Sequence, residues 1–526
     1  MDSQLVKRRR GDDDGKAITT DRLSQLPQPV LHNILSLLSQ KDAVQTSVLS
    51  KSWRYLWHGR LNVEFRDDDF CLERKIEFWS FVDKTLQRYL DQNLSLQKFL
   101  LDIHLIDLVL LKKWIPVVIM DMGVRSLKLI FSYSGTSFGL PLVVFQSESL
   151  VELHLQCRNL SKLKSTDNVM LKNLRTLRLH YVYITDEVFE KIISGCPLIE
   201  NLDMLKCIGM KSIKLHKHHN NIKDFVCSVS VPVIVEIEES LSLESLRIEN
   251  CCHNWFLPHK TMHFPHLKSL NLYGVELPAE TFGNFSSFFP SLIELSLNYC
   301  KGEKEFILLS SSIKRLTINM DLKNRIKAFI DTPNILYFEY SGDGFLPSIK
   351  FMATSNEWKS QISLCYKLKP SDNDATSWFF KLNKLLKALS QSHITLKLSA
   401  YNYQKLHIND SLGGFYKPVV VEHLKLRGEF SSSSDPTKLN YFFRICRPRY
   451  IHVDQYVNEV VEFICNLIPD EIGCYFWLQD LEEVSIEVWD IKTEEWNCVE
   501  RTSLPPLPSK QQIRFRLTWR EHCNSH

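Results

Sequence analysis

The most informative feature of the chain is a hydrophobic pattern that returns at a nearly constant interval. Each copy has an apolar residue, two other residues, a leucine or phenylalanine, one further residue and a second apolar residue. The central residues, in chain order, are Phe99, Leu127, Leu153, Leu177, Leu202, Phe225, Leu246, Leu270, Leu295, Leu316 and Phe338. Successive centres lie 21 to 28 residues apart, and a period of this size indicates a repeat architecture.

The spacing is typical of leucine-rich repeats, in which each unit adds one short strand to a shared parallel sheet. Five residues after its centre, such a repeat needs a small or buried residue where the chain turns away from the strand. Cys207, Cys251 and Cys300 occupy this position in three copies, and Val182 and Val275 in two others. Because a free cysteine packs like a small apolar residue, cysteines at this position support the alignment of the repeats.

The second half of each repeat is expected to be helical. After Leu177, Thr185 is a suitable N-cap, and Gly195 followed by Pro197 would end the helix. The apolar face of this helix would carry Val188, Phe189, Ile192 and Ile193. One unit cannot bury its apolar face alone, so neighbouring units are expected to stack.

Each strand also carries one residue between its two apolar positions. Side chains alternate between the two faces of a strand, so this residue should point away from the core, onto the concave face of the stack. This geometry alone selects the candidate binding face: Lys128, His154, Arg178, Asp203, Arg247, Asn271 and Ser296.

Residues 21–60 show a different, helical periodicity. Val30, Leu31, Ile34, Leu35 and Leu38 share one face of a first helix, and Pro27 and Pro29 suit its first turn. A second short helix is expected around Ala43 to Val48, and a third after Ser50 with Trp53, Leu56 and Trp57 on one face. So many large apolar residues in forty positions either cover the first repeat as a cap or bind a partner.

Composition is that of a soluble globular chain, with 44% apolar and 24% charged residues. The net charge of +3 over 526 residues is too small to indicate a nucleic-acid or membrane partner. No segment has the length and apolar character of a membrane span, and the N-terminus lacks the apolar core of a signal peptide. We therefore expect a nuclear or cytoplasmic protein whose 14 cysteines are free thiols.

The segment at 21–60 resembles an F-box, in the version found in plant F-box/leucine-rich-repeat proteins. The matching stretches are Asp21–Ser24, Leu26–Pro27, Val30–Leu31, Ile34–Leu35, Leu38, Lys41–Val44, Thr46–Lys51 and Trp53–Trp57. The likeness continues through Trp114–Ile115 and Ile193–Pro197 to about residue 345. Two positions depart from it: Pro29 stands where an acidic residue is usual, and Ser39–Gln40 where Pro-Thr is common. Losing the acid removes a helix N-terminal charge interaction of roughly 0.3–1 kcal/mol.

This resemblance implies the substrate receptor of a Skp–cullin–F-box ubiquitin ligase. The F-box would bind a Skp-type adaptor, which connects to a cullin and a RING subunit, and the repeats would hold an unknown target protein. The chain itself would be neither an enzyme nor dependent on a cofactor. The residues expected to contact the adaptor, or to hold the helices that do, are Leu26, Pro27, Val30, Leu31, Ile34, Leu35, Leu38, Val48, Leu49 and Trp53.

The resulting α/β organisation is a three-helix F-box followed by a curved parallel sheet with a helical or irregular outer face. Its expected divisions are a disordered charged tail at 1–20, the F-box at 21–60, the solenoid at 61–345, irregular terminal repeats at 346–500 and a tail at 501–526. A helix is expected at 376–389, and further strand copies at 394–398 and 421–426.

Other chemical signals are weak. Lys7–Arg10 is a nuclear import signal, a phosphate-binding arm or, as we favour, part of a solvated tail. The histidines at 216, 218 and 219 and the Cys251–Cys252–His253 run do not have convincing zinc-ligand spacing, so no metal site is assigned. We found no nucleophile elbow, P-loop, HExxH or kinase signature. A repeat scaffold without ligase association remains the alternative, and a small-molecule receptor is a third, less favoured possibility.

Overall fold

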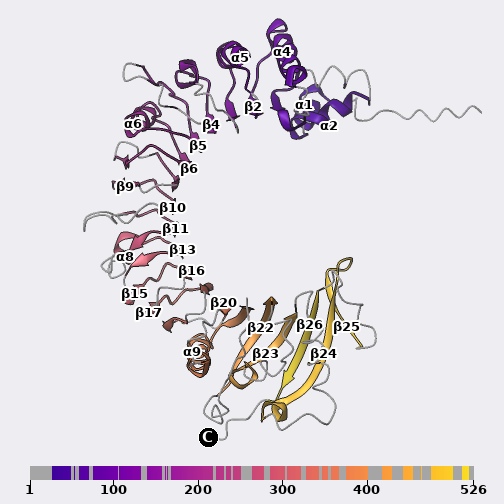
Figure 1. Ribbon diagram of the computed structural model, residues 1–526, viewed down its shortest axis with the longest axis vertical. Helices are drawn as coiled ribbons and strands as arrows, with labels where there is room; N and C mark the ends of the chain where they lie inside the picture. Colours follow the sequence, from indigo (N-terminus) through magenta and orange to yellow (C-terminus); the bar gives the residue numbers. More distant parts are fainter. Residues whose placement is uncertain are drawn as a thin grey trace, which may run out of the picture. The chain divides into compact units, whose positions relative to one another are not determined.

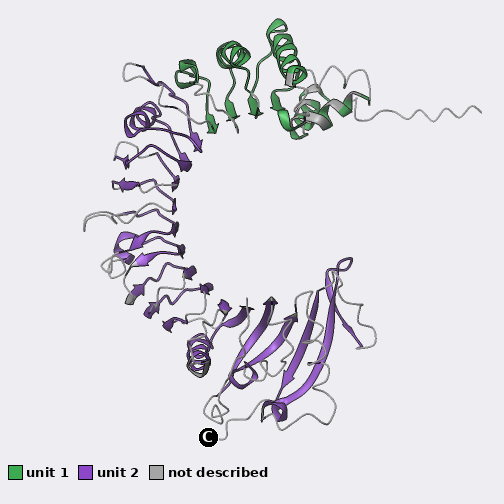
Figure 2. Ribbon diagram, in the orientation of Figure 1, with its two compact units in different colours: residues 1–158 green, residues 159–526 purple. Residues whose placement is uncertain are grey.

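The computed structural model describes most of the repeat region and part of the N-terminal helical segment. The described residues are 26–38, 40–48, 53, 59–69, 75–104, 106–131, 139–156, 160, 163, 167–216, 221–229, 233–238, 241–249, 263–277, 285–302, 305–320, 327–342, 346–352, 357–366, 375–400, 417–428, 442–453, 464, 476–500 and 512–520. The chain divides into two compact units, residues 1–158 and 159–526 (Figure 2). This division falls inside the predicted solenoid, so the F-box segment and the first repeats belong to one unit.

Unit 1 combines short N-terminal helices with the first strands of the repeat ladder. The helical segments before the ladder are α1 (Gln28–Leu37), α2 (Gln40–Gln45) and η1 (Thr46–Val48). Most of the expected third helix, around Trp53, lies outside the described residues. The parallel ladder runs in the order β1 (Asn62–Arg66), β2 (Lys98–Ile103), β3 (Ser126–Phe131) and β4 (Glu152–Gln156).

The helical segments between these strands are η3 (Asp67–Asp69), α4 (Lys75–Asp91), α5 (Leu108–Met120) and η5 (Leu142–Phe145). Helix α5 begins where the Asp107 carboxylate accepts hydrogen bonds from the Val109 and Leu110 amides, which have no partner within the helix. Its buried face includes Trp114 and Ile115. No helix in the described ranges combines the length and apolarity required to span a bilayer.

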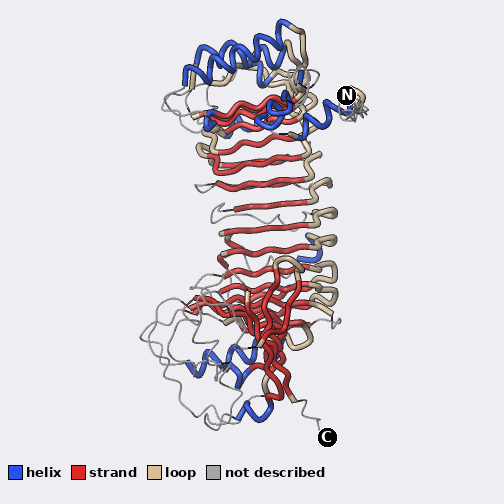
Figure 3. The backbone as a smooth tube through the Cα atoms, turned by 90° about the vertical axis from the view of Figure 1, so that its right-hand side faces the viewer, coloured by secondary structure: helices blue, strands red, loops and turns tan. Residues whose placement is uncertain are grey.

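Unit 2 is built on a long parallel ladder whose strands lie along the inner side of its curve (Figures 1 and 3). The first strands in pairing order are β5 (Thr176–His180), β6 (Asn201–Cys207), β8 (Asp224–Val229), β10 (Ser245–Glu249), β11 (Ser269–Tyr273), β13 (Glu294–Asn298), β16 (Arg315–Met320) and β18 (Tyr337–Gly342). The ladder continues through β20 (Lys359–Tyr366), β21 (His393–Ala400), β22 (Val419–Gly428) and β23 (Cys446–Val453).

The predicted repeat centres are in register and form the core of each unit. In unit 1, Phe99 pairs with Leu127 and Leu127 with Leu153. In unit 2 the pairing runs without a shift through Leu177, Leu202, Phe225, Leu246, Leu270, Leu295, Leu316 and Phe338. All eleven centres are at most 2% exposed, so the repeat pattern and its register are confirmed.

Several strands end in a feature that the sequence pattern had not revealed. Four residues after the centre, the backbone enters the left-handed region at Tyr181, Lys206, Gly274 and Tyr299. This turn directs the next residue inward. Val182, Cys207 and Val275 are fully buried and Cys300 nearly so, while Cys251 lies outside the described residues. The left-handed residue therefore explains why a small buried residue follows it.

The helical prediction for the second half of each repeat is only partly correct. Helix α6 (Asp186–Ser194) has Thr185 as its N-cap, and the four predicted apolar residues are buried; α8 (Phe285–Phe288) is a single short turn. Elsewhere the outer side carries short parallel strands: β7 (Ser212–Leu215), β9 (Ile234–Ile237), β12 (Glu276–Leu277), β14 (Lys301–Gly302), β15 (Glu305–Leu309), β17 (Lys327–Asp331) and β19 (Ser348–Met352). An extended chain rises about 3.3 Å per residue against 1.5 Å in a helix, so a strand crosses the outer side with fewer residues than a helix does.

The C-terminal region completes the sheet with antiparallel strands. Helix α9 (Ala375–Ala388) lies close to the predicted range and buries its predicted apolar face, and β21 and β22 contain the predicted strand copies. Strand β26 (Ile513–Trp519) pairs antiparallel with β23 and with β24 (Leu481–Asp490), which follows η8 (Phe476–Asp480) and pairs with β25 (Glu495–Val499). The prediction of a plain tail at 501–526 was therefore wrong for residues 513–519. Alternation of Ile513, Phe515 and Leu517 with polar neighbours carried the missed strand signal.

Candidate functional site

The first candidate surface is the helical segment at the start of unit 1, which has a small core of its own. Leu31, Leu35, Ala43 and Trp53 are each at most 3% exposed and pack together. Leu26, Ile34 and Leu38 are half-buried against this cluster. Helix α1 begins after Pro27, whose carbonyl oxygen accepts hydrogen bonds from the amides of Val30 and Leu31. These residues hold the helices, and the buried ones cannot themselves form a docking surface.

A second group of apolar side chains in the same segment faces solvent. Val30 is 40% exposed and Val48 is 84% exposed, while Pro27 is also exposed. Leu37, at the C-terminal end of α1, is 87% exposed and was not selected from the sequence. Leu38, next to it, had been selected through the resemblance to an F-box, and it is half-buried. Exposed apolar side chains are typical of interaction surfaces where they form one contiguous patch.

The ten predicted adaptor residues thus fall into distinct groups. Leu31, Leu35 and Trp53 are core, Leu26, Ile34 and Leu38 are intermediate, and Pro27, Val30 and Val48 are exposed. Leu49 lies outside the described residues. Whether these residues contact an adaptor stays a prediction, but the exposed group is the part of the set that is positioned for contact.

Arg60 connects this segment to the repeats. Its guanidinium Nη2 donates a 2.6 Å hydrogen bond to the Leu38 carbonyl, just after α1, and its own carbonyl accepts a 2.8 Å bond from the Tyr89 hydroxyl in α4. Burial lowers the pKa of Arg60 and raises the pKa of Tyr89 to about 12. Together the two groups tie the helical segment to the first repeat.

The second candidate surface is the open face of the strands. In unit 2, the residue after each repeat centre forms one continuous row across the ladder, in which Arg178 pairs with Asp203 and Asn271 with Ser296. Arg247 stands between them in the same row. In unit 1, Lys128 pairs with His154. All seven predicted residues are exposed or half-buried, as the alternation of side chains requires.

Polar contacts link neighbouring strands on this face. Asp203 Oδ2 lies 3.1 Å from the Nε2 atom of His180, and the Asn298 amide donates a 3.2 Å hydrogen bond to Asn271 Oδ1. The sequence did not indicate how far the row continues. It extends through Thr317, Glu339, Gln361, Thr395, His423, Tyr450 and Arg516.

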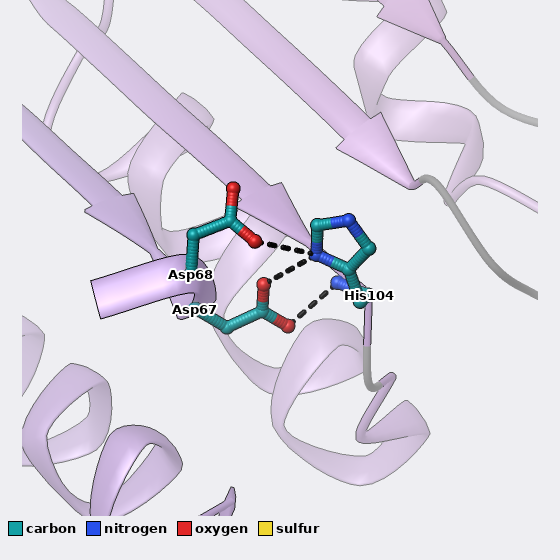
Figure 4. Close-up of side chains that lie close together, drawn as sticks. All are labelled: Asp67, Asp68 and His104. Atoms are coloured by element: carbon teal, nitrogen blue, oxygen red, sulfur yellow. Dashed lines mark hydrogen bonds and ion pairs between the residues drawn. The ribbon is translucent and has the colours of Figure 1, made fainter. Parts of the chain in front are cut away.

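A third cluster lies at the ends of β1 and β2 and contains Asp67, Asp68 and His104 (Figure 4). The Nδ1 atom of His104 lies 2.8 Å from Asp67 Oδ1 and 3.3 Å from Asp68 Oδ1, and the His104 amide donates a 2.6 Å bond to Asp67 Oδ2. The hydrogen bond that the ring donates to the Asp67 carboxylate raises the pKa of His104. These contacts brace the turns after two successive strands, and they account for the cluster without a metal.

The histidine run that the sequence had suggested as a weak metal signal has a similar explanation. His216 lies 3.2 Å from Glu238 Oε1, between neighbouring outer strands. His218 and His219, and the Cys251–Cys252–His253 run, lie outside the described residues.

A helical module followed by a leucine-rich parallel ladder defines the class, and comparison with known proteins agrees. Residues 23–63 match the F-box domain model. Residues 111–248 match the model described as FBD-associated F-box protein At5g56370, LRR repeats. The chain therefore combines an F-box domain with leucine-rich repeats of the plant F-box/LRR-repeat type, and the resemblance inferred from the sequence is confirmed.

Individual relatives come from Arabidopsis thaliana. F-box/LRR-repeat protein At3g59200 is 35% identical over 229 residues, which is 41% of this chain and 40% of the relative. Putative F-box/FBD/LRR-repeat protein At4g13965 is 34% identical over 38% of this chain and 44% of its own length. F-box/FBD/LRR-repeat protein At4g00160 is 27% identical over 53% of this chain and 61% of the relative. In the first two comparisons, the match spans less than half of the relative.

Proposed function

We propose that the chain is a substrate-recognition subunit of a Skp–cullin–F-box ubiquitin ligase, acting in the nucleus or cytoplasm. Its F-box would bind a Skp-type adaptor and, through it, a cullin and a RING subunit. The open strand face would bind the target protein for ubiquitination. The chain would contribute binding surfaces and no catalytic group, cofactor, nucleic-acid contact or membrane contact.

One observation carries this proposal: the segment that matches an F-box leaves apolar side chains exposed while it has a core of its own. The apolar side chains of Val30, Leu37 and Val48 are exposed to solvent. A helical cap whose role was to shield the first repeat would bury such side chains. Burial of a few large apolar residues at a partner's surface is the usual source of binding energy at protein interfaces.

The test is binding of a purified Skp-type adaptor to the full chain. Combined Val30→Asp, Leu37→Asp and Val48→Asp substitutions should weaken adaptor binding at least a hundredfold, because charged groups would enter an apolar interface. Val109→Asp is the matched control, since Val109 is 76% exposed on α5 of the same unit. It should bind as the unmodified chain does.

The buried leucines are unsuitable for this test. Leu31→Asp or Leu35→Asp would place an unpaired charge in the small core and unfold the segment, so a loss of binding would have no clear meaning. The ligase role is refuted if the triple variant melts normally and still binds the adaptor with unchanged affinity. If the unmodified chain does not bind the adaptor, the repeat-scaffold alternative is favoured.

A further inference from the structure

Cations gather on the open face of the C-terminal strands of unit 2, where Figure 1 shows β22 to β26 side by side. Lys397 pairs across the ladder with Lys425, Lys425 with His452, and His452 with Arg514. In the neighbouring row, His423 pairs with Tyr450 and Tyr450 with Arg516. Adjacent strands are about 4.8 Å apart. The surface formed by Lys397, Lys425 and Arg516, with the residues between them, is called the basic face below.

The charges of the basic face repel one another. The pKa of Lys425 is lowered by burial and then by the charges of Lys397 and Arg427. The pKa of His452 is lowered to about 3 by burial and by His423, Lys425 and Arg514. Like charges directly opposite each other destabilise a sheet. Residues that lower the stability of a fold are often retained because they serve a function.

Carboxylates do not neutralise these cations within the part of the chain that the structure describes. Glu487 on β24 is engaged by Arg514, with Nε 2.5 Å from Oε2. Glu483 lies one row further along β24, opposite Thr518. Among the described residues, Lys397, Lys425 and Arg516 form no ion pair. The basic face is therefore suited to an anionic partner.

The aromatic residues beside the cations favour a protein over a nucleic acid. The Arg514 guanidinium lies over the Tyr450 ring at 4.4 Å and over the Trp496 ring at 4.2 Å. One face of each ring is thus covered by a cation, which leaves less ring surface for the base stacking by which aromatic side chains usually hold single strands. The chain's small net charge also lacks the extended field that a nucleic acid requires.

We propose that the basic face binds an acidic segment of a protein, whose carboxylate or phosphate groups pair with Lys397, Lys425 and Arg516. The two rows lie two residues apart along the strands, a rise of about 6.6 Å. This rise equals the separation of alternate side chains in an extended peptide, so acidic groups at every second position fit both rows. That the segment belongs to a ubiquitination substrate rests on the function proposed above.

The test uses the full chain and three labelled twelve-residue peptides in fluorescence anisotropy. The first peptide alternates glutamate with serine. The second alternates glutamine with phosphoserine, and the third alternates glutamine with unmodified serine. The glutamate and phosphoserine peptides should bind saturably at low salt and more weakly at 300 mM salt. The uncharged peptide should bind at least tenfold more weakly. The two anionic peptides distinguish a carboxylate from a phosphate as the preferred group.

The double variant Lys397→Gln with Lys425→Gln should weaken binding of the anionic peptides at least tenfold. It should melt at the same temperature as the unmodified chain or higher, because the mutual repulsion is gone. Arg516→Gln, in the other row, should also weaken binding. Lys384→Gln with Lys387→Gln removes the same charge from exposed positions of α9 and should leave binding unchanged.

The proposal is overturned if neither anionic peptide binds saturably, if the α9 control loses affinity equally, or if the uncharged peptide binds as well. It is also overturned if a single-stranded oligonucleotide displaces the peptide at a lower concentration than unlabelled peptide does. Adaptor binding is measured on the same preparation. Adaptor binding without peptide binding refutes the basic face alone, and peptide binding without adaptor binding refutes the ligase role alone.

Discussion

At the scale of single residues, the repeats centred on Leu177, Leu202, Leu270 and Leu295 share two consecutive positions at the end of the strand. The left-handed residue turns the chain, and the buried residue after it fills the space between neighbouring repeats. Cys207 donates a hydrogen bond from Sγ to the Leu179 carbonyl at 3.1 Å, and burial raises its pKa to about 12. Cys300 makes the same contact with Leu272 at 3.5 Å. A thiol at this position thus fills a gap and also satisfies a carbonyl of the preceding repeat.

Gly195 was predicted correctly to end a helix, but its backbone conformation is not what requires a glycine at this position. It ends α6, as its sequence position predicted, but its φ of −78° is one that any residue can adopt. The constraint is space, because a Cβ atom at Gly195 would lie 2.6 Å from the carbonyl oxygen of Val169. The Leu171 amide also donates to the Gly195 carbonyl, which holds the two segments together.

Gly195→Ala should therefore lower the free energy of unfolding by about 1–3 kcal/mol, the usual cost of inserting a methyl group into a packed site. Urea unfolding followed by circular dichroism measures this loss. Gly59→Ala is the control, because no atom lies within 4 Å of its added Cβ, and its effect should stay within about 0.5 kcal/mol. Equal stability of the two variants would contradict the close approach at Gly195.

At the scale of elements, neighbouring strands are joined by side-chain pairs on the open face as well as by backbone hydrogen bonds. The Nε2 atom of His452 on β23 lies 3.1 Å from Nδ1 of His423 on β22. Burial is the main cause that lowers the pKa of both rings, and nearby Lys425 and Arg514 lower both further, whereas Glu422 acts in the opposite direction on His423. The pair is therefore neutral at pH 7 in the folded chain.

The lowered pKa of His452 predicts acid sensitivity. The unfolded chain binds a proton near pH 6.5 while the folded chain binds it only near pH 3, so the stability contribution is complete above pH 6.5 and falls with decreasing pH. A single such group adds a slope of about 1.4 kcal/mol per pH unit between the two pKa values. His452→Gln should flatten the dependence of unfolding free energy on pH between 6.5 and 4, measured in urea.

His104 provides a control of opposite sign. Its pKa is raised in the folded chain by the hydrogen bond to Asp67, so its contribution is complete below pH 6.5 and is lost as pH rises through the raised value. His104→Gln should therefore cost more stability at acidic pH than at pH 8. A His452→Gln variant that kept the full acid slope would show that this ring does not determine the acid sensitivity.

At the scale of the whole molecule, the parallel ladder of unit 2 ends in antiparallel strands, which cover the edge of its last parallel strand. The row of parallel strands would otherwise end at β23 with an unpaired edge, which is prone to pair with other chains. Strand β26 covers this edge and joins it to the β24–β25 hairpin. The Trp519 indole donates a 2.7 Å hydrogen bond to the Pro448 carbonyl, and the Arg447 guanidinium bonds Asp480 Oδ2 at 2.6 Å.

A chain ending at residue 511 should therefore lose the cover of β23 and aggregate. Size-exclusion chromatography should show large assemblies, and the thermal transition should broaden or move down by several degrees. A chain ending at residue 520 retains β26 and should remain as monodisperse as the full chain. If the shorter chain also stays monodisperse with an unchanged transition, β26 does not protect the ladder.

Sequence alone determined the repeat architecture, the register of the strands and the residues on their open face. The physical reason is that period and alternation are local properties: every repeat centre must be apolar, and the residue beside it must point the other way. The F-box was equally accessible, because its pattern occupies one continuous segment. Two buried cysteines, Cys207 and Cys300, could also be placed from their distance to the repeat centre.

Only the tertiary structure showed which residues are buried, which are exposed and which lie together on one surface. Leu31 and Val30 both lie on the apolar face predicted for α1, and only packing showed that the first is core and the second is exposed. The ladder also continues past Phe338. There the next repeat centre is the buried Ser360, which is hydrogen-bonded to Ser392, so the apolar pattern is lost although the fold continues.

Lys397, Lys425 and Arg516 are far apart in the sequence. Strand pairing brings them together, and no local pattern could have shown that they share one surface.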